Sequence, residues 1–324
     1  MEKPRLTYVD HSYHERTGSN RFLQDLLAAE FDVTRVWNET WRSEASQLRA
    51  ETINATRPDY LVLFQSLPRR AEFVRIRCPN VTWVPMHDSV GYGEHWRGWR
   101  HSGMKAICFC ARDRAYFAGL GLETLHVQYA PAPQTLAPAH AALSVFFWMR
   151  HEAIGWDTLK CLLGTQRPER IVLRVAPDPG HAPTLPPEDD RRTYSIELHQ
   201  GWMDAERYRQ LLSTCSLFMA PRPSEGIGQA LLEARAMGLA AIAPDAPTMN
   251  EYMRHGETGY LYDLRTPGQL DFSDLWGVRQ RSVADLATLH ERWRASQASV
   301  LAFVRKPMRP PPRWWRIRSW LARN

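Results

Sequence analysis

Short apolar runs recur along this chain at intervals long enough to hold a helix between them. Residues 60–64, 81–84 and 106–109 are three such runs, and each is apolar almost throughout rather than alternating. A strand has this pattern when both faces of its sheet are covered, as in parallel sheets. Parallel strands are joined by crossovers that are usually helices. The pattern therefore predicts an α/β chain with doubly wound parallel sheets. Among the connecting segments, it predicts helices at 43–56 and 156–163, a helix that Asp204 caps, and loops at 10–20 and 176–192.

The chain is long enough for more than one such sheet. Its 324 residues suit two domains of about 150 residues each. Residues 129–140 contain three prolines and no charged residue other than His140, as expected for a semi-rigid linker. The expected bounds are a first α/β domain at 1–133, a Pro/Ala-rich linker at 134–142, a second α/β domain at 143–304 and a basic aromatic tail at 305–324.

The net charge of +6 belongs to the end of the chain. Residues 305–324 contain seven Lys/Arg and no acid, so the rest of the chain has a net charge of about −1. A nucleic-acid-binding body needs a basic surface, and we therefore expect no nucleic-acid partner. Five scattered cysteines favour a reducing compartment, and the chain shows neither a membrane-spanning run nor a signal peptide. The expected location is the cytoplasm.

The densest signal is a glycine-containing turn between a strand and a helix in the second half of the chain. Gly226 and Gly228 let the backbone approach a ligand closely, and the N–H groups of the helix start suit a phosphate or diphosphate. Glu225 and Glu233 flank this anion site, which suits carboxylates that accept hydrogen bonds from hydroxyl groups. A capping box is the alternative, but Ile227 stands where its Glu or Gln would be. The pattern favours a nucleotide sugar as the ligand.

Residues 216–263 resemble the donor-binding signature of family 4 of the retaining GT-B glycosyltransferases. The signature has two glutamates separated by seven residues, with Gly-x-Gly after the first and Ala-x-Ala-x-Gly near the second, as here at positions 225–238. The resemblance implies two Rossmann-like domains that face an interdomain cleft. It also implies that Glu225 contacts the donor sugar, that Glu233 binds the ribose, and that the backbone of Gly226, Ile227 and Gly228 holds the diphosphate.

Two further positions are similar to this family in the first half of the chain. Gly18 precedes the first long helix, where the family has a glycine loop that faces the donor diphosphate and the acceptor. His87, in His87-Asp88 after an apolar run, is similar to the histidine that leans over the transferred sugar. The resemblance therefore implies that both residues belong to the site.

The start of the second domain departs from the family pattern. The family has Gly-Arg and then a lysine, and the two cations hold the diphosphate; here Arg150 is present, but Ile154 stands in place of the lysine. Losing one cation weakens stabilisation of the leaving group unless another base substitutes. Arg222 and Arg174 are both candidates, and the sequence does not distinguish them.

The sequence therefore predicts a retaining glycosyltransferase that moves a sugar from a nucleotide sugar to a glycan or lipid-linked acceptor, in the setting of surface polysaccharide assembly. No Asp-x-Asp segment is present, so we expect no divalent metal and no cofactor beyond the nucleotide-sugar cosubstrate. The expected catalytic residues are His87, Glu225 and Arg150, and the expected donor-binding residues are Gly18, Gly226, Ile227, Gly228 and Glu233. The alternatives are a catalytically silent GT-B module that binds a glycan or nucleotide, and a GT-B domain detached from a larger polymerase.

The aromatic residues leave two questions open. Trp96 and Trp99 could line an acceptor groove or fill the core. In the tail, the prolines at 310–312 separate a final segment whose Trp314, Ile317, Trp320 and Leu321 would gather on one side of a helix. This segment could associate with an anionic membrane surface at the periphery, pack back on the first domain, or be disordered.

Overall fold

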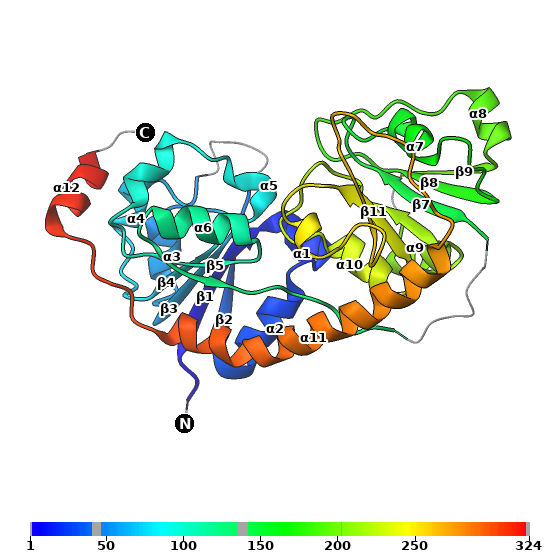
Figure 1. Cartoon of the computed structure of the whole chain (residues 1–324). Helices are drawn as coiled ribbons and strands as arrows, with labels where there is room; N and C mark the ends of the chain where they lie inside the picture. The colour runs from blue at the N-terminus through cyan, green and yellow to red at the C-terminus, as the bar shows by residue number, and fades with distance from the viewer. Residues whose placement is uncertain (1, 41–46, 135–141, 202, 322–324) are drawn as a thin grey trace. The chain divides into compact units, whose positions relative to one another are not determined.

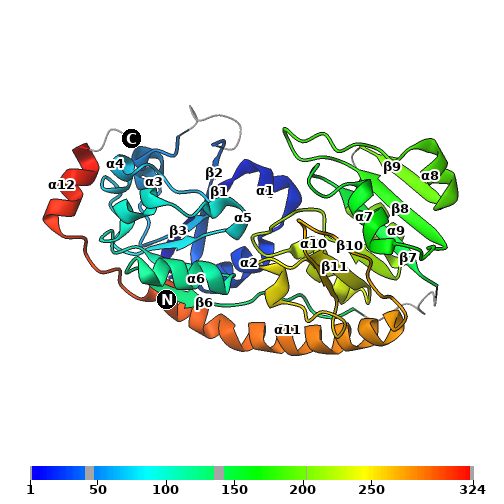
Figure 2. The same cartoon turned by 45° about the horizontal axis from the view of Figure 1, so that its top comes forward.

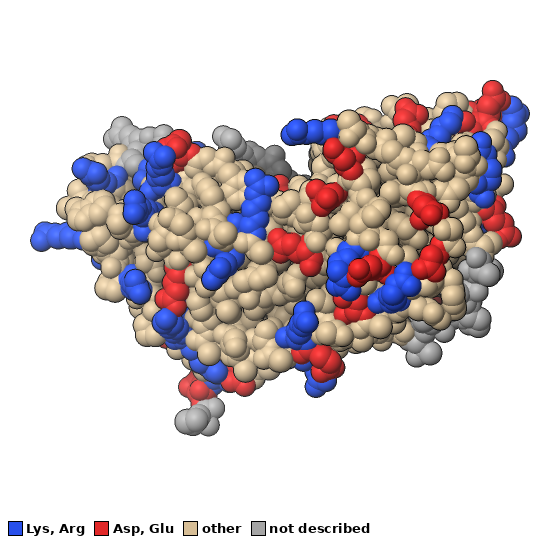
Figure 3. All heavy atoms as spheres, viewed as in Figure 1, with Lys and Arg blue, Asp and Glu red and all other residues tan. Residues whose placement is uncertain are grey.

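The computed structural model describes residues 2–40, 47–134, 142–201 and 203–321. They divide into two compact units (Figure 1). Unit 1 comprises Met1–Gln128 and Trp293–Asn324, and unit 2 comprises Tyr129–Arg292. Each unit has one six-stranded parallel sheet flanked by helices, so the expected α/β class with two doubly wound sheets is confirmed. On the face that Figure 3 shows, acidic and basic side chains are interspersed over both units.

The sheet of unit 1 has the strand order β2-β1-β3-β4-β5-β6. Its strands are β1 (Arg5–His11), β2 (Asp32–Asn38), β3 (Tyr60–Phe64), β4 (Val81–Val84), β5 (Lys105–Cys108) and β6 (Glu123–His126). The helices are α1 (Ser12–Thr17), α2 (Arg21–Glu30), α3 (Ala50–Ala55), α4 (Arg70–Phe73), α5 (His87–Val90), the 3₁₀ helix η1 (Glu94–Trp99) and α6 (Ala111–Gly119). Strands β4 and β5 are buried throughout, and this includes Lys105 at the start of β5, which lies just before the expected apolar run.

The sheet of unit 2 has the strand order β12-β11-β10-β7-β8-β9. Its strands are β7 (Ser144–Met149), β8 (Arg170–Val175), β9 (Ile196–Gln200), β10 (Leu217–Met219), β11 (Ala240–Pro244) and β12 (Tyr260–Tyr262). The helices are α7 (Trp156–Leu163), α8 (Glu188–Thr193), α9 (Ala205–Ser213), α10 (Gln229–Ala236) and the 3₁₀ helix η2 (Met249–Glu251). Asp204 caps α9 as expected, because its Oδ1 accepts from the N–H of Arg207 at 2.7 Å.

A long helix, α11 (Leu275–Arg305), begins in unit 2 and ends in unit 1, and α12 (Arg313–Leu321) follows it (Figures 1 and 2). The bounds expected from the sequence placed residues 293–304 in the second domain, whereas the structure assigns them to unit 1. The tail is part of unit 1 as well: Trp315 is buried and its indole N–H donates to the carbonyl of Gly98 at 2.8 Å. Among the described helices, α11 included, none has the length and apolar character needed to span a bilayer.

Some expectations about local structure are wrong. The loop expected at 10–20 contains α1, and the loop expected at 176–192 contains most of α8. Both helices are short and polar, so no apolar periodicity marks them. Of the helix expected at 43–56, residues 50–55 are helical and 43–46 lie outside the described residues, as do positions 135–141 of the expected linker. Trp96 and Trp99 are core residues of unit 1, so they do not line a groove.

Candidate donor site

The candidate site of unit 2 lies where the order of its strands changes direction. The chain places β8 and β9 on one side of β7, and β10, β11 and β12 on the other. In open α/β sheets, ligands bind beyond the carboxyl ends of the strands at such a switch point. Arg150 follows β7 directly, and residues 220–228 follow β10. The topology thus brings the two expected donor-binding segments of unit 2 to the same edge of one sheet.

The turn before α10 has the backbone that the glycines permit. Gly228 precedes the helix with a φ of 78°, a left-handed conformation that strains residues with a side chain. The hydroxyl of Thr248 donates to the carbonyl oxygen of Glu225 at 2.8 Å and holds the turn. Ile227 is only 6% exposed, so its backbone rather than its side chain is what it can offer a ligand. Helix α10 ends at Ala236, and Gly238, two residues on, has the left-handed φ of 83° that is common just after a helix end.

Two guanidinium groups share one carboxylate beside this turn. Arg150 donates from Nε and Nη2 to Oδ1 of Asp178 at 2.9 and 2.5 Å. Arg222 donates from Nε to Oδ2 of the same carboxylate at 2.7 Å, and its Nη1 lies 3.7 Å from Oε2 of Glu225. The cluster of Arg150, Asp178 and Arg222 carries one net positive charge. We call it the Asp178 cluster.

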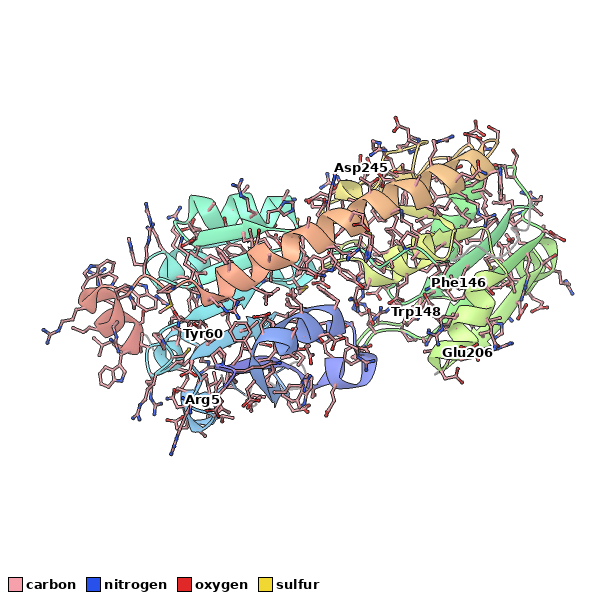
Figure 4. All side chains as sticks on the ribbon, turned by 90° about the horizontal axis from the view of Figure 1, so that it is seen from below. Arg5, Tyr60, Phe146, Trp148, Glu206 and Asp245 are labelled. Carbon is pink, nitrogen blue, oxygen red and sulfur yellow. The ribbon has the colours of Figure 1, made fainter. Side chains whose placement is uncertain are left out.

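Arg174 and Arg222 are the two candidates for the second cation at the diphosphate, and their surroundings in the structure distinguish them. Arg174, on β8, is 7% exposed and lies 4.0 Å over the ring of Trp148, a β7 residue labelled in Figure 4. The side chain of Arg222 keeps 26% of its surface exposed and is linked to Arg150 through Asp178. Ile154 is fully buried in the core of unit 2 and supplies nothing to the surface. Arg222 is therefore the accessible second cation near Arg150.

Glu233 lies on α10 and is exposed to solvent, yet the surrounding protein removes enough water to raise the pKa of its carboxyl. The charge of Arg209 opposes this shift. The charge of Glu233 in turn adds to the burial that raises the pKa of Tyr129 to about 12. Glu233 thus occupies a crowded position on the surface, where a hydroxyl-bearing ligand would give it hydrogen-bond donors.

His87, the expected catalytic histidine, belongs to unit 1 and begins α5 after β4. Its Nδ1 lies 2.8 Å from Oδ1 of the buried Asp113, and the hydroxyl of Tyr92 donates to the same oxygen. Burial lowers the pKa of His87, but the hydrogen bonds to Asp113 and Cys110 and their charges outweigh burial and raise it to about 10. The carboxylate of Asp113 thus favours the protonated form of His87, and the sequence context of His87 did not reveal this partner.

Gly18 closes α1 with a φ of 61°, and its N–H donates to the carbonyl of His14 at 2.8 Å. A polar network that the sequence analysis missed lies next to it. The buried carboxylate of Asp10 binds His14 at 2.7 Å and also accepts from the amide of Asn20. Asp10 is the next-to-last residue of β1. The sequence signal that could have identified it is an ionisable residue within a mainly apolar strand.

The expected site residues therefore fall into two groups. His87 and Gly18 belong to unit 1, and the other six belong to unit 2. Within the described residues, two clusters contain metal-ligand side chains: His87 with Cys110 and Asp113, and His151 with Glu152 and His181. In each, a histidine already pairs with a carboxylate, at 2.8 Å for His87 and 2.7 Å for His181. The independence from metal ions stays a prediction.

The fold defined by the two units is that of the GT-B glycosyltransferases. A glycosyltransferase from Rickettsia africae aligns over 94% of this chain and 98% of its own, with a TM-score of 0.64 and 12% identity. HepE from Anabaena, solved with UDP-glucose, aligns over 92% and 99% with a TM-score of 0.59 and 15% identity. The lipopolysaccharide outer core galactosyltransferase WaaB aligns over 93% and 98% with a TM-score of 0.56 and 11% identity. At these identities the similarity shows the fold.

A family-model match in the sequence supports the same class of protein. Residues 185–271 match the family model of the group 1 glycosyl transferases, and this segment contains the turn and helix that carry Glu225 and Glu233. No curated protein matches the chain in a sequence search. The resemblance to the GT-B glycosyltransferases that the sequence suggested is thus confirmed.

Proposed function

We propose that this protein is a retaining, metal-independent glycosyltransferase that moves a sugar from a nucleotide sugar to a glycan or lipid-linked acceptor. The observation that carries the proposal is the Asp178 cluster beside the glycine turn, at the switch point of the unit 2 sheet. Guanidinium groups and the N–H groups at a helix start are the donors that bind a diphosphate. The group 1 family match covers the glycine turn and Arg222, and it supports this assignment.

The chain's own residues would act mainly by position and charge. In the reaction, the bond between the anomeric carbon and the diphosphate oxygen breaks, and the oxygen keeps the electron pair. The acceptor hydroxyl bonds to that carbon and releases its proton. Arg150, Arg222 and the first N–H groups of α10 would stabilise the charge that develops on the leaving diphosphate. Glu225 and Glu233 would accept hydrogen bonds from donor hydroxyls, and His87, fixed by Asp113, would contact the transferred sugar.

A donor screen tests the proposal. The full chain is mixed with UDP-, GDP- and ADP-sugars, and binding is followed by calorimetry and nucleotide release by a coupled assay. We expect one donor to bind, Glu233→Ala to weaken that binding, and EDTA to leave turnover unchanged. Glu188→Ala is the matched control, since Glu188 forms a surface pair with Arg191 on α8 in the same unit. If no nucleotide sugar binds, and Glu233→Ala changes neither binding nor nucleotide release, the proposal is wrong.

Ile154 favours a second candidate function, a catalytically silent module that binds a nucleotide or glycan. Its burial means that this position gives the site no cation. Donor binding without turnover on any acceptor, together with unchanged cellular function in Glu225→Ala, would support this module over the enzyme.

The acceptor and the location complete the proposal. WaaB is a lipopolysaccharide galactosyltransferase of similar fold, which supports surface polysaccharide assembly as the setting. A protein that transfers sugar to a lipid-linked acceptor would act as a peripheral protein at the cytoplasmic face of a membrane. It would have no nucleic-acid partner.

A further inference from the structure

Helix α12 is attached to unit 1 along one side. Trp315 is 4% exposed, donates its indole N–H to the carbonyl of Gly98 at 2.8 Å and packs with its ring edge-on to Phe73. Ser319, four residues on, is fully buried. At about 100° per residue these two side chains share one side of the helix. The orientation of α12 on unit 1 is therefore fixed by its buried side.

The opposite side of α12 is apolar and exposed. Trp314, Ile317, Trp320 and Leu321 are 48%, 51%, 64% and 62% exposed. The only other large apolar side chain exposed to this degree among the described residues is Trp276. A contiguous group of four on a nine-residue helix is unusual for a solvated surface and marks an interaction site. We call these four residues the α12 apolar face.

Cations border the α12 apolar face on both edges. At about 100° per residue, Arg318 lies on one edge and Arg316 on the other, whereas Arg313, at the start of the helix, lies within the face between Ile317 and Trp320. All three are exposed, and residues 305–324 contain no acid. Figure 3 shows Lys and Arg side chains protruding at the end of unit 1 where Figure 1 draws α12.

A basic hollow adjoins the same helix. Arg316 lines it together with Arg75, Arg77 and Glu51, and its volume is about 630 Å³. Arg75 pairs with Glu51 and Glu72, whereas among the described residues no carboxylate lies within ion-pair distance of Arg77 or Arg316. Two guanidinium groups at such a hollow suit a phosphate group.

We infer that α12 docks unit 1 on an anionic membrane surface, with its apolar face at the level of the lipid headgroups and its arginines on lipid phosphates. Tryptophan prefers the headgroup region, and a helix of this kind lies in the plane of the interface. The flanking charges are those that anionic lipids attract. A short helix gives weak and reversible binding, which falls as salt screens the arginines. This inference does not depend on the transferase activity.

Vesicle co-sedimentation of the full chain tests the inference. Vesicles of phosphatidylcholine alone are compared with vesicles that also contain phosphatidylglycerol, at low and at high salt. We expect at least tenfold more binding to the anionic vesicles at low salt and a large loss at high salt. The double variant Ile317→Ser/Trp320→Ser should lose at least tenfold of this binding, and the triple variant Arg313→Gln/Arg316→Gln/Arg318→Gln should lose its dependence on the anionic lipid.

Trp276→Ser is the matched control, because Trp276 is 50% exposed but belongs to unit 2, and we expect wild-type binding from it. Thermal unfolding of each variant checks that the fold is kept, and nucleotide binding in solution should equal that of the wild type in all of them. Absence of binding to anionic vesicles, or equal binding by the double variant, would overturn the inference. So would a dimer in sedimentation velocity that the double variant abolishes while vesicles bind neither protein, because α12 would then contact a second copy.

Discussion

Each carboxylate oxygen of Asp178 accepts a hydrogen bond from a different arginine, Oδ1 from Arg150 and Oδ2 from Arg222. These bonds hold both guanidinium groups beside the glycine turn. We predict that Arg222→Ala weakens binding of the donor's nucleoside diphosphate by about tenfold or more, since a hydrogen bond to a charged group contributes about 1.5–3 kcal/mol. Calorimetry measures the change. Arg192→Ala is the control, because Arg192 forms an exposed pair with Asp189 on α8 of the same unit. Unchanged affinity in Arg222→Ala would leave the site with Arg150 alone.

The pair of His87 and Asp113 predicts a pH dependence of stability in unit 1. Because the folded pKa of about 10 exceeds the unfolded value of about 6.5, the contribution of the pair is complete below pH 6.5 and is lost as the pH rises toward 10. Asp113→Asn should therefore lose most stability relative to the wild type near pH 6 and least near pH 10. Urea unfolding at several pH values measures this difference.

Asp59→Asn serves as the control for that experiment. Asp59 pairs with Arg5 on the surface of unit 1, and neither group changes its charge between pH 6 and 10. Its loss of stability should stay small and constant over this range. A constant loss in Asp113→Asn as well would mean that His87 is neutral in the folded protein.

The sequence could predict some site residues and not others, for physical reasons. Glu225, Gly228 and Glu233 lie in one local turn and helix, where spacing along the chain is spacing in space. Asp113 and Asp178 are distant in sequence from the residues that they bind, at 26 and 28 positions from His87 and Arg150. Only the assembled sheet brings such partners together, so no local pattern announced them.

At the scale of elements, the end of α11 depends on a buried amine. Lys105, on β5, is fully buried, and its Nζ donates to the carbonyls of Phe303 at 2.6 Å, Val304 at 3.1 Å and Lys306. Burial lowers the pKa of Lys105 to about 8. Phe303 and Val304 lie in the last turn of α11, where a helix end leaves its carbonyls without partners in the helix. One side chain thus attaches the end of α11 to the sheet of unit 1.

We predict that Lys105→Met destabilises the protein by about 1–3 kcal/mol, because it fills the same space but leaves buried carbonyls without donors. Urea unfolding followed by circular dichroism measures the loss. Lys306→Met is the control: Lys306 pairs with Glu123 at the surface, where such pairs contribute about 1 kcal/mol or less. Equal losses in the two variants would show that α11 is held by packing alone.

Strands in the middle of each sheet were predictable, whereas the edge strands β6 and β9 were not. The runs at 60–64, 81–84 and 106–109 are apolar because both of their faces are covered. Strand β6 and strand β9 lie at sheet edges, are only half-buried over most of their length and contain Glu and His, so their sequences resemble those of loops. Helix α7 coincides with its expected range at 156–163 because its apolar positions recur at helical spacing.

For the whole molecule, the division of the site residues between the units makes a prediction about donor binding. Hydrogen exchange should show that a nucleoside diphosphate protects the segments after β7 and β10 in unit 2. If His87 and Gly18 have their expected roles, the complete nucleotide sugar extends this protection to α5 and to the segment at Gly18 in unit 1. The backbone around Trp276 is the internal control. Protection confined to unit 2 with every donor would remove His87 and Gly18 from the site.

The buried place of Ile154 bears on how this chain can evolve. A lysine at this position would put an ammonium group into the apolar core of unit 2, which lowers stability by several kcal/mol on the order-of-magnitude scale for an unpaired buried charge. A single substitution back to the residue of the family pattern therefore harms the fold before it can help any site. Arg222 and Asp178, by contrast, can vary at the surface. The fold of unit 2 thus excludes an ammonium group at position 154, and the positive charge at this edge of the sheet has to come from guanidinium groups.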